Sequence, residues 1–400
     1  MHTNRLINLF RDNRLLCILL IGALLWLDCL PSLAGQQKVY FAGFAFLGDS
    51  CNNDQDLPYS RKIFALKDSA TNVSRLNTAL LSRIGRKTYS DFELVTDSLG
   101  DHQSAGALSL AIALDWESIN TEQIDNLFKV VVNIHGQVLI FNFNEKKILA
   151  SYPAGVRVND VLKKAPDDAY FTKLFEKIYF DKIDGINALD EFIKRLDQIK
   201  LKESFNQHIK VSAVVVEEKS KEYLPDDIKN RPEAFKTFIA QQFGTFLSSN
   251  LGIAILPYTT GEAIGNTMAC RFQNGSVFNL TIPKEDIALK ITLRGFKKVK
   301  LDENTTGCSW AYGTFINFSA LNPFQDSIVN ARFKSAAVKI VPSSQQTVSD
   351  WPSYQESMLS LFDQLTRQIS LRESSWLETK AEDKDVKNQL KELEKALKGT

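Results

Sequence analysis

The sequence predicts an α+β fold of two similar domains, each a mixed β-sheet with helices packed on it. Each half of the chain contains a hairpin pattern of apolar residues followed by a helical pattern. The length of 400 residues exceeds what one hydrophobic core usually spans, and 44% hydrophobic with 24% charged residues is typical of folded globular protein. We therefore expect a first domain at 35–205 and a second at 206–371.

The first hairpin is expected at 127–143 and 147–158, joined by the polar turn 144–146. Apolar residues alternate along its first arm, as in a strand with one buried face. The nearly continuous apolar run at 38–47 predicts a strand covered on both faces. The other elements expected in this half are a polar loop at 48–61, a helix with its apolar stripe from Val73 to Ile84, strands at 92–97 and 107–116, and helices at 170–180 and 186–199.

The second half repeats this order of patterns with different residues, which predicts tandem duplication of one α+β module. The boundary is expected near residues 200–207. The elements expected after it are strands at 209–217, 253–258, 278–282 and 287–300, a helix at 232–249, a hairpin at 310–321 and 328–341, and a helix at 354–369.

A short strand reading Phe-Glu-Leu-Val at 92–95 precedes a hairpin that runs from Val-Leu-Ile-Phe at 138–141 to Ile-Leu-Ala-Ser at 148–151. Together with the strand and helix before them and the helix after them, these elements resemble the periplasmic α/β module of the curli-secretion channel, flagellar outer-membrane and TolB amino-terminal families. The resemblance covers each half once. It implies an envelope protein that binds or assembles with protein partners.

Residues 1–34 have the pattern of a secretory signal peptide. Three arginines precede an apolar run at 15–27, and the small-residue site Ser32-Leu33-Ala34 follows. The apolar run is shorter than the roughly 20 residues that cross a bilayer. We therefore expect cleavage after Ala34 and a periplasmic or secreted mature chain without an integral membrane span. The residues before Cys29 lack the small side chains of a lipoprotein processing site.

Of the five cysteines, two lie in the expected signal peptide. Cys51, Cys270 and Cys308 remain in an oxidising compartment, where disulfides form. Cys270 and Cys308 are the natural pair because both belong to the second half. The alternative is that all three are reduced and behave as small hydrophobic residues.

The charged tail at 372–400 carries a two-heptad apolar stripe of Val386, Leu390, Leu393 and Leu397. Isolated short helices are marginal in water, so we expect a solvated, frayed terminal helix. The alternative is a short coiled coil or a docking helix.

Forty-eight basic and 47 acidic side chains leave no general field that would attract nucleic acid. Acidic residues follow the cluster of cations at the end of the strand at 287–300, so we expect a solvated charged face there. The cluster consists of Lys290, Arg294, Lys297, Lys298 and Lys300.

The common catalytic, metal-binding and nucleotide-binding motifs are missing from the sequence. In the mature chain the histidines are His102, His135 and His208, and no two have the i, i+4 spacing of a zinc site. His135 could serve as a general base, but no fixed carboxylate partner is evident, so we interpret it as structural. We assign no catalytic, cofactor-binding or metal-binding residue.

Two further groups of polar residues have some features of ligand sites. Asp181 and Asp184 suggest a calcium loop, but Phe180 and Lys182 occupy ligand positions, so we expect a turn between helices. The oxygens and thiol at 49–54 follow a buried strand, where α/β proteins often bind ligands, and are otherwise a polar loop.

Asp115 and Glu117 flank Trp116 on an expected strand and should point to the same face. Paired carboxylates could support hydrolysis. The leading interpretation is nevertheless an exported, non-catalytic binding or adaptor protein, with protein partners in cell-envelope assembly. The alternatives are an exported carboxylate-dependent hydrolase and a periplasmic small-ligand-binding protein.

Overall fold

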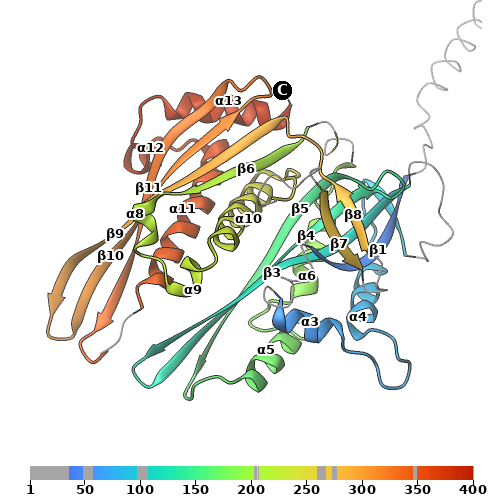
Figure 1. Ribbon diagram of the computed structural model, residues 1–400, viewed down its shortest axis with the longest axis horizontal. Helices are drawn as coiled ribbons and strands as arrows, with labels where there is room; N and C mark the ends of the chain where they lie inside the picture. The colour runs from blue at the N-terminus through green and yellow to red at the C-terminus, as the bar shows by residue number, and fades with distance from the viewer. Residues whose placement is uncertain are drawn as a thin grey trace, which may run out of the picture. The chain divides into compact units, whose positions relative to one another are not determined.

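The computed structural model describes residues 36–47, 57–96, 107–201, 205, 207–258, 267–272, 277–345 and 349–399. Two mixed sheets with helices packed on them form an α+β fold, as predicted (Figure 1). The expected signal peptide, the loop at 49–54, Cys51 and His102 lie outside the described residues.

The first sheet is built around the predicted hairpin. The first strand pairs with the third in parallel, and the fourth strand pairs with both the third and the fifth in antiparallel orientation. A short second strand lies on the other side of the first. These strands are β1 (Gln37–Leu47), β2 (Phe92–Val95), β3 (Leu108–Ile124), β4 (Leu127–Asn142) and β5 (Lys147–Leu162).

The second sheet has the same order of pairing: parallel once, then antiparallel twice. Its strands are β6 (Ile209–Val216), β9 (Ile287–Asn304), β10 (Gly307–Leu321) and β11 (Ser327–Pro342). The strand expected at 253–258 is wrong, because Leu256 forms only an isolated parallel bridge with Lys210 of β6. Leu256 thus has the same position next to β6 in the second sheet as β2 has next to β1 in the first. The shared order is what tandem duplication would produce, and duplication remains a prediction.

Two strands from the second half of the sequence, β7 (Thr267–Phe272) and β8 (Val277–Thr281), belong to the first sheet. β7 pairs with β1, and β8 pairs with both β7 and β5, so the pairing closes into a ring. β7 was not predicted. The ring explains the continuous apolar run of β3, where alternate residues such as Ala111 and Ala113 pack with Met268 and Leu280 inside it.

The expected pairing of Cys270 with Cys308 is wrong, because both cysteines are free. Cys270 is buried on β7, which joins the first sheet, whereas Cys308 lies near the start of β10 in the second. Membership of one half of the sequence therefore did not bring the two thiols together.

Four helices cover one face of the first sheet: α3 (Pro58–Phe64), α4 (Arg75–Ile84), α5 (Asp168–Phe180) and α6 (Ala188–Leu196). α3 overturns part of the polar loop expected at 48–61. Leu76, Leu80 and Ile84 of α4 are buried as expected, but Val73 precedes the helix and is 51% exposed.

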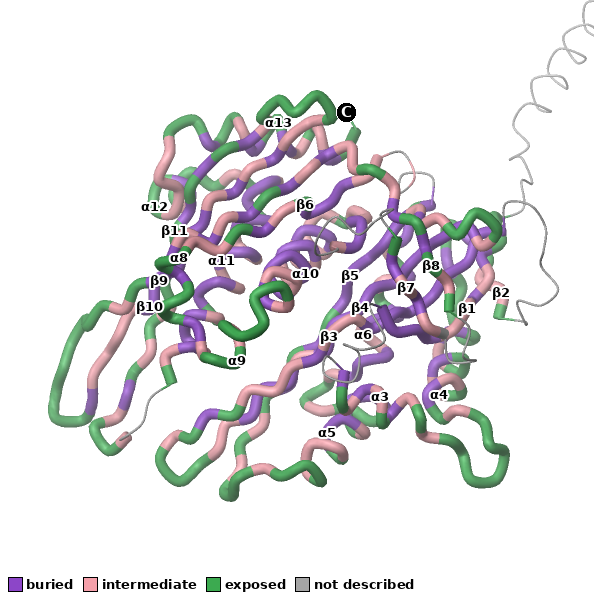
Figure 2. The backbone as a smooth tube through the Cα atoms, in the orientation of Figure 1, coloured by how far each residue is buried: buried purple, intermediate pink, exposed green. Residues whose placement is uncertain are grey.

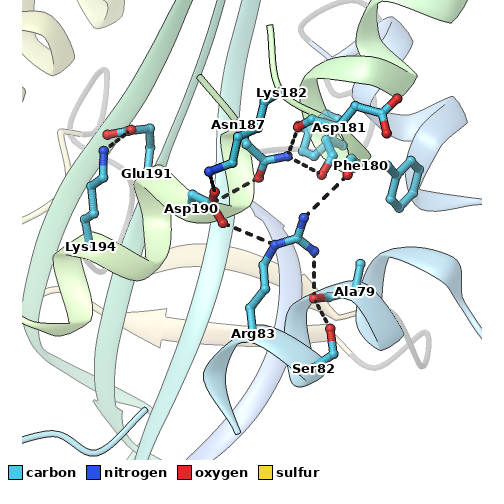
Figure 3. Close-up of polar contacts among 11 residues, drawn as sticks. Ala79, Ser82, Arg83, Phe180, Asp181, Lys182, Asn187, Asp190, Glu191 and Lys194 are labelled. Carbon is cyan, nitrogen blue, oxygen red and sulfur yellow. Dashed lines mark hydrogen bonds and ion pairs between the residues drawn. The ribbon is translucent and has the colours of Figure 1, made fainter. Parts of the chain in front are cut away.

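Asn187 joins the ends of α5 and α6 (Figure 3). Its Oδ1 accepts a hydrogen bond from the Asp190 amide at 3.1 Å, and its Nδ2 donates to the Tyr179 carbonyl at 3.0 Å. Arg83 of α4 donates to Asp190 Oδ1 at 3.2 Å. The segment that contains Asp181 and Asp184 is therefore a turn between two helices, as predicted.

Helices also pack against the second sheet. The ring of Phe243 lies 5.2 Å from that of Phe318 on β10 and 5.5 Å from that of Phe362 on the last long helix, measured between centroids. No helix among the described residues is long and apolar enough to cross a membrane. The helices are α8 (Glu218–Lys221), α9 (Asp226–Lys229), α10 (Pro232–Leu251) and α11 (Trp351–Leu371).

The charged tail is not frayed and solvated, so that expectation is wrong. It forms α12 (Ser374–Lys380) and α13 (Val386–Lys398), and all four residues of the apolar stripe are buried. α13 packs against β11 and α11. The stripe persists because a neighbouring sheet and helix cover it, which an isolated helix would lack.

We expect Leu393→Ala to lower the free energy of unfolding by about 2–5 kcal/mol, because it leaves a cavity under α13. The matched control is Lys391→Ala on the exposed side of the same helix, which should change stability by no more than about 0.5 kcal/mol. Denaturant unfolding of both variants measures the difference. Equal effects would show that α13 does not pack on the second sheet.

Candidate functional site

A β-bulge at Asp115 determines where the polar residues of β3 point. Leu114 pairs with Gly136 and Trp116 pairs with His135, so Asp115 is the extra residue. Its carboxylate lies on the side of His135, with Asp115 Oδ1 2.6 Å from His135 Nδ1. Glu117 projects to the opposite face, where it contacts α3. The expectation that Asp115 and Glu117 share a face is therefore wrong, because the bulge shifts the alternation by one residue.

His135 has a fixed carboxylate partner, contrary to expectation. Its Nε2 lies 2.7 Å from the Thr245 hydroxyl on α10, and that hydroxyl donates to the Gln241 carbonyl at 2.8 Å. The side chains of His135 and Asp115 are only 2% and 6% exposed. Both ring nitrogens of His135 therefore have a polar partner, Asp115 at Nδ1 and Thr245 at Nε2.

The order carboxylate, imidazole, hydroxyl is that of a nucleophile activated by a general base. Here the hydroxyl proton is already directed to a helix carbonyl, and the imidazole is buried. Gln137 Nε2 donates to the second oxygen of Asp115 at 2.8 Å and so holds the carboxylate in place. The arrangement therefore links the first sheet to α10, and the interpretation of His135 as structural fits it.

Gly136 allows the close packing beside this chain of hydrogen bonds. A Cβ at this position would lie 2.7 Å from the Ala113 carbonyl oxygen and 3.0 Å from the ring of Phe192. Both contacts are closer than side-chain atoms tolerate. Only glycine therefore permits β3 and α6 to approach β4 at this point.

Glu117 fixes α3 against the other face of the sheet. Its two carboxylate oxygens accept hydrogen bonds from the backbone amides of Tyr59 and Ser60, at 2.6 and 2.9 Å. The Ser60 hydroxyl in turn lies 2.8 Å from the Tyr179 hydroxyl. Burial raises the pKa of Glu117 to about 7, and the hydrogen bonds from Ser60 and Tyr59 oppose this rise.

The cation cluster on β9 is partly ion-paired rather than simply solvated. Arg294 lies 2.6 Å from Glu382, and Lys298 lies 2.8 Å from Asp350 at the start of α11. His208 Nδ1 lies 3.5 Å from Asp286 in a separate region of the chain. No group of three or more potential metal ligands among His, Cys, Asp and Glu occurs within the part of the chain that the structure describes.

A cleft of about 140 Å³ lies where the long strands of the first sheet pass α11 and β11. β4 and β5 contribute Lys129 and Arg157, and neither forms an ion pair with another described residue. α11 contributes Glu356 and Leu359, and β11 contributes its residues 337–339. The cleft therefore combines cations with the carboxylates of Glu122 and Glu356, several apolar side chains and the edge of a sheet.

One end of this cleft is bounded by contacts between the two sheets. Lys339 of β11 donates a hydrogen bond to Glu122 of β3 at 2.5 Å, and these side chains are 19% and 8% exposed. Beyond this pair, the Ser344 hydroxyl donates to Asp125 Oδ1 at 3.1 Å. These contacts position β11 over the face of the first sheet.

Lys129, Arg157 and Lys339 belong to no motif that would mark them in the sequence as cleft residues. Lys129 and Arg157 project from the same face of the predicted hairpin, which pairs Asn133 with Arg157. That alternation was available from the sequence. The covering helix and strand come from about 200 residues further along the chain, and no local pattern indicates them.

We expect Thr245→Val to lower stability by about 1–3 kcal/mol, because Nε2 of the buried His135 loses its partner. Thr237→Val on the same helix is the control, since the Thr237 hydroxyl donates to the Glu233 carbonyl and to no other group among the described residues. It should cost no more than about 0.5 kcal/mol. Denaturant unfolding measures both variants, and similar losses would contradict a structural role for the His135 contact.

Glu117 predicts a pH dependence of stability. Its pKa rises from an ordinary value of 4.5 to about 7 on folding, so the folded state favours the protonated form. The resulting stabilisation is complete below pH 4.5 and is lost as the pH rises through 7, by about 3 kcal/mol in all. Glu117→Gln cannot titrate, so its unfolding free energy should fall less between pH 5 and 8 than that of the wild type. Parallel pH profiles would contradict the assignment.

Comparisons with known proteins yield no identification. The sequence matches no known protein family and no curated protein. Among solved structures, a minor lipoprotein from Acinetobacter baumannii is similar with a TM-score of 0.20 and 12% identity, over 40% of this chain and 94% of that one. A neuraminyllactose-binding hemagglutinin homolog from Helicobacter pylori gives 0.24 and 10%, over 43% of this chain and 86% of that one. Likenesses at this level carry no functional argument, and they do not confirm the resemblance to the curli-secretion, flagellar and TolB families.

Proposed function

We propose that this chain is an exported, non-catalytic binding protein, an adaptor that holds a segment of a partner protein in the cleft between the two sheets. The observation that carries the proposal is the pair of cations, Lys129 and Arg157, which face the cleft without a carboxylate partner among the described residues. Such cations offer an anionic group both charge and hydrogen-bond donors.

The size of the cleft favours a protein segment over a free small molecule. Small-molecule sites usually enclose about 300–1,000 Å³, whereas this cleft has about 140 Å³. That volume accepts one or two side chains of a larger partner. An exported small-ligand-binding protein is therefore the second candidate.

A hydrolase that uses Asp115 and Glu117 as a pair does not fit the geometry, because the two carboxylates point to opposite faces of the sheet. Each carboxylate is also held by fixed partners. A binding role needs no such pair.

The envelope as the place of action rests on residues 1–34, whose charged, apolar and small-residue regions have the pattern of a secretory leader. An exported adaptor would find its partners in the periplasm or outside the cell. This part of the proposal is independent of the cleft.

The test places a photo-crosslinking amino acid at Asn120 in the cleft and, as a control, at Lys173 on the exposed side of α5, in the full chain expressed in its native host. We expect one discrete cross-linked protein from position 120 and none of it from position 173. Changing both Lys129 and Arg157 to Glu should abolish the product. Equal products from both positions would overturn the proposal. A small molecule that co-purifies with the wild type but not with the double variant would favour the second candidate instead.

A further inference from the structure

We infer that the open part of the β11 edge, from Lys334 to Ile340, binds an extended peptide in which apolar and acidic residues alternate. This inference rests on the proposed function and specifies the form that the partner takes. The peptide would add a strand to the second sheet and direct its acidic side chains into the cleft.

The direction of the backbone groups of β11 follows from contacts of its first half. The Arg332 amide and carbonyl, and the Asn330 amide, bond to groups outside the sheet. Even-numbered residues therefore point their backbone groups away from β10. The register with β10 stays continuous from Val329 to Pro342, so Lys334, Ala336, Val338 and Ile340 do the same.

The chain itself covers the first half of this edge. Ala381 forms a bridge with Phe333, the Glu382 amide donates to the Arg332 carbonyl at 2.9 Å, and the Arg332 amide donates to Asp383 at 2.7 Å. From Lys334 to Ile340, the outward backbone groups of the even-numbered residues have no hydrogen-bond partner among the residues that the structure describes. The half left open borders the cleft, to which residues 337–339 contribute.

An unpaired edge is a template for a further strand. On this edge Val338 and Ile340 are 63% and 74% exposed. Val299 and Leu301 of β9 are also exposed and extend the apolar surface across the sheet. The apolar side chains of a strand added beside β11 would lie on the same face of the sheet as Val338 and Ile340 and would pack against them.

The opposite face of such a strand would look toward the cleft. Lys339 on that face is already neutralised by Glu122, but Lys129 and Arg157 are not paired with described residues. Acidic side chains at alternate positions would reach these cations. The two faces together specify the alternation of apolar and acidic residues.

Charge also favours a partner peptide over a second copy of this chain. Self-pairing of the open edge would bring the sequence Lys334 to Ile340 against itself, and this segment contains two lysines and no acid. It would add positive charge beside Lys129 and Arg157. An acidic segment neutralises them.

The probe is a synthetic nonapeptide of alternating Val and Glu, and its binding to the full chain is followed by fluorescence anisotropy. We expect it to bind at least ten times more tightly than the matched Val and Lys peptide. Two further peptides carry N-methyl groups on all Val amides or on all Glu amides. Only one set of amides faces β11, so one of them should lose binding at least tenfold and the other should retain it. Equal behaviour of the two would exclude strand addition.

Protein variants locate the site. Val338→Pro removes an outward N–H without breaking a bond to β10, which an edge strand tolerates, and should weaken peptide binding at least tenfold. Val338→Ala keeps the N–H and should weaken it less. Should Val338→Pro fail to fold, the paired change of Lys129 and Arg157 to Glu should abolish binding, whereas Lys290→Glu, an exposed cation away from the cleft, should not. Equal binding by the Lys129 and Arg157 double variant and by the Lys290→Glu variant would overturn the inference.

Failure of the inference can be told apart from failure of the proposed function. A specific cross-link from Asn120 without peptide binding would leave the adaptor proposal standing and refute the strand. Peptide binding at β11 without that cross-link would support the strand and refute the cleft as the partner site. A dimer that Val338→Pro dissociates, with no peptide binding, would identify a second copy as the occupant and overturn the inference.

Discussion

The need to cover the edges of two sheets is the physical constraint on which this structure depends. An exposed strand edge presents unpaired backbone groups that attract other chains. β7 and β8 close the first sheet by pairing with β1 and β5. In the second sheet Leu256 covers part of β6, and residues 381–383 cover part of β11. β7, β8 and residues 381–383 lie outside the order of pairing that the two sheets share, and their positions are explained by the edges they protect.

The two sheets are linked by a few buried polar contacts. His135 on β4 of the first sheet lies 2.7 Å from Thr245 on α10, a helix that packs on the second sheet. Lys339 on β11 of the second sheet donates to Glu122 on β3 of the first. Because these groups are shielded from water, loss of either partner would leave a polar atom without compensation. The cleft beside β11 is lined by residues of β3, β4, β5, β11 and α11. The outer ends of the long strands in both sheets are mostly exposed or intermediate (Figure 2).

One part of the β11 edge is covered by the chain, and the other part is open. Residues 330–333 are covered by the chain, and the lysines at 334 and 339 are typical of edges that avoid non-specific pairing. Val338 and Ile340 have the opposite character, since exposed apolar side chains on an edge favour association. A site that admits a strand only when its charges match would reconcile these features, and the cations in the cleft provide that condition.

The sequence by itself determined the elements whose signal is local. Both hairpins, the long helices and the α+β class follow from alternation and helical periodicity, which are set by neighbouring residues. The bulge at Asp115 was not predictable, since pairing with β4 creates it, and it reversed the expected direction of the carboxylate. The tail stripe was visible in the sequence, but its partner surface on β11 and α11 was not. Tertiary structure alone decided the burial of His135, the separation of Cys270 from Cys308 and the meeting of Arg157 with β11, because each depends on contacts between segments about 100 or more residues apart, which no local pattern encodes.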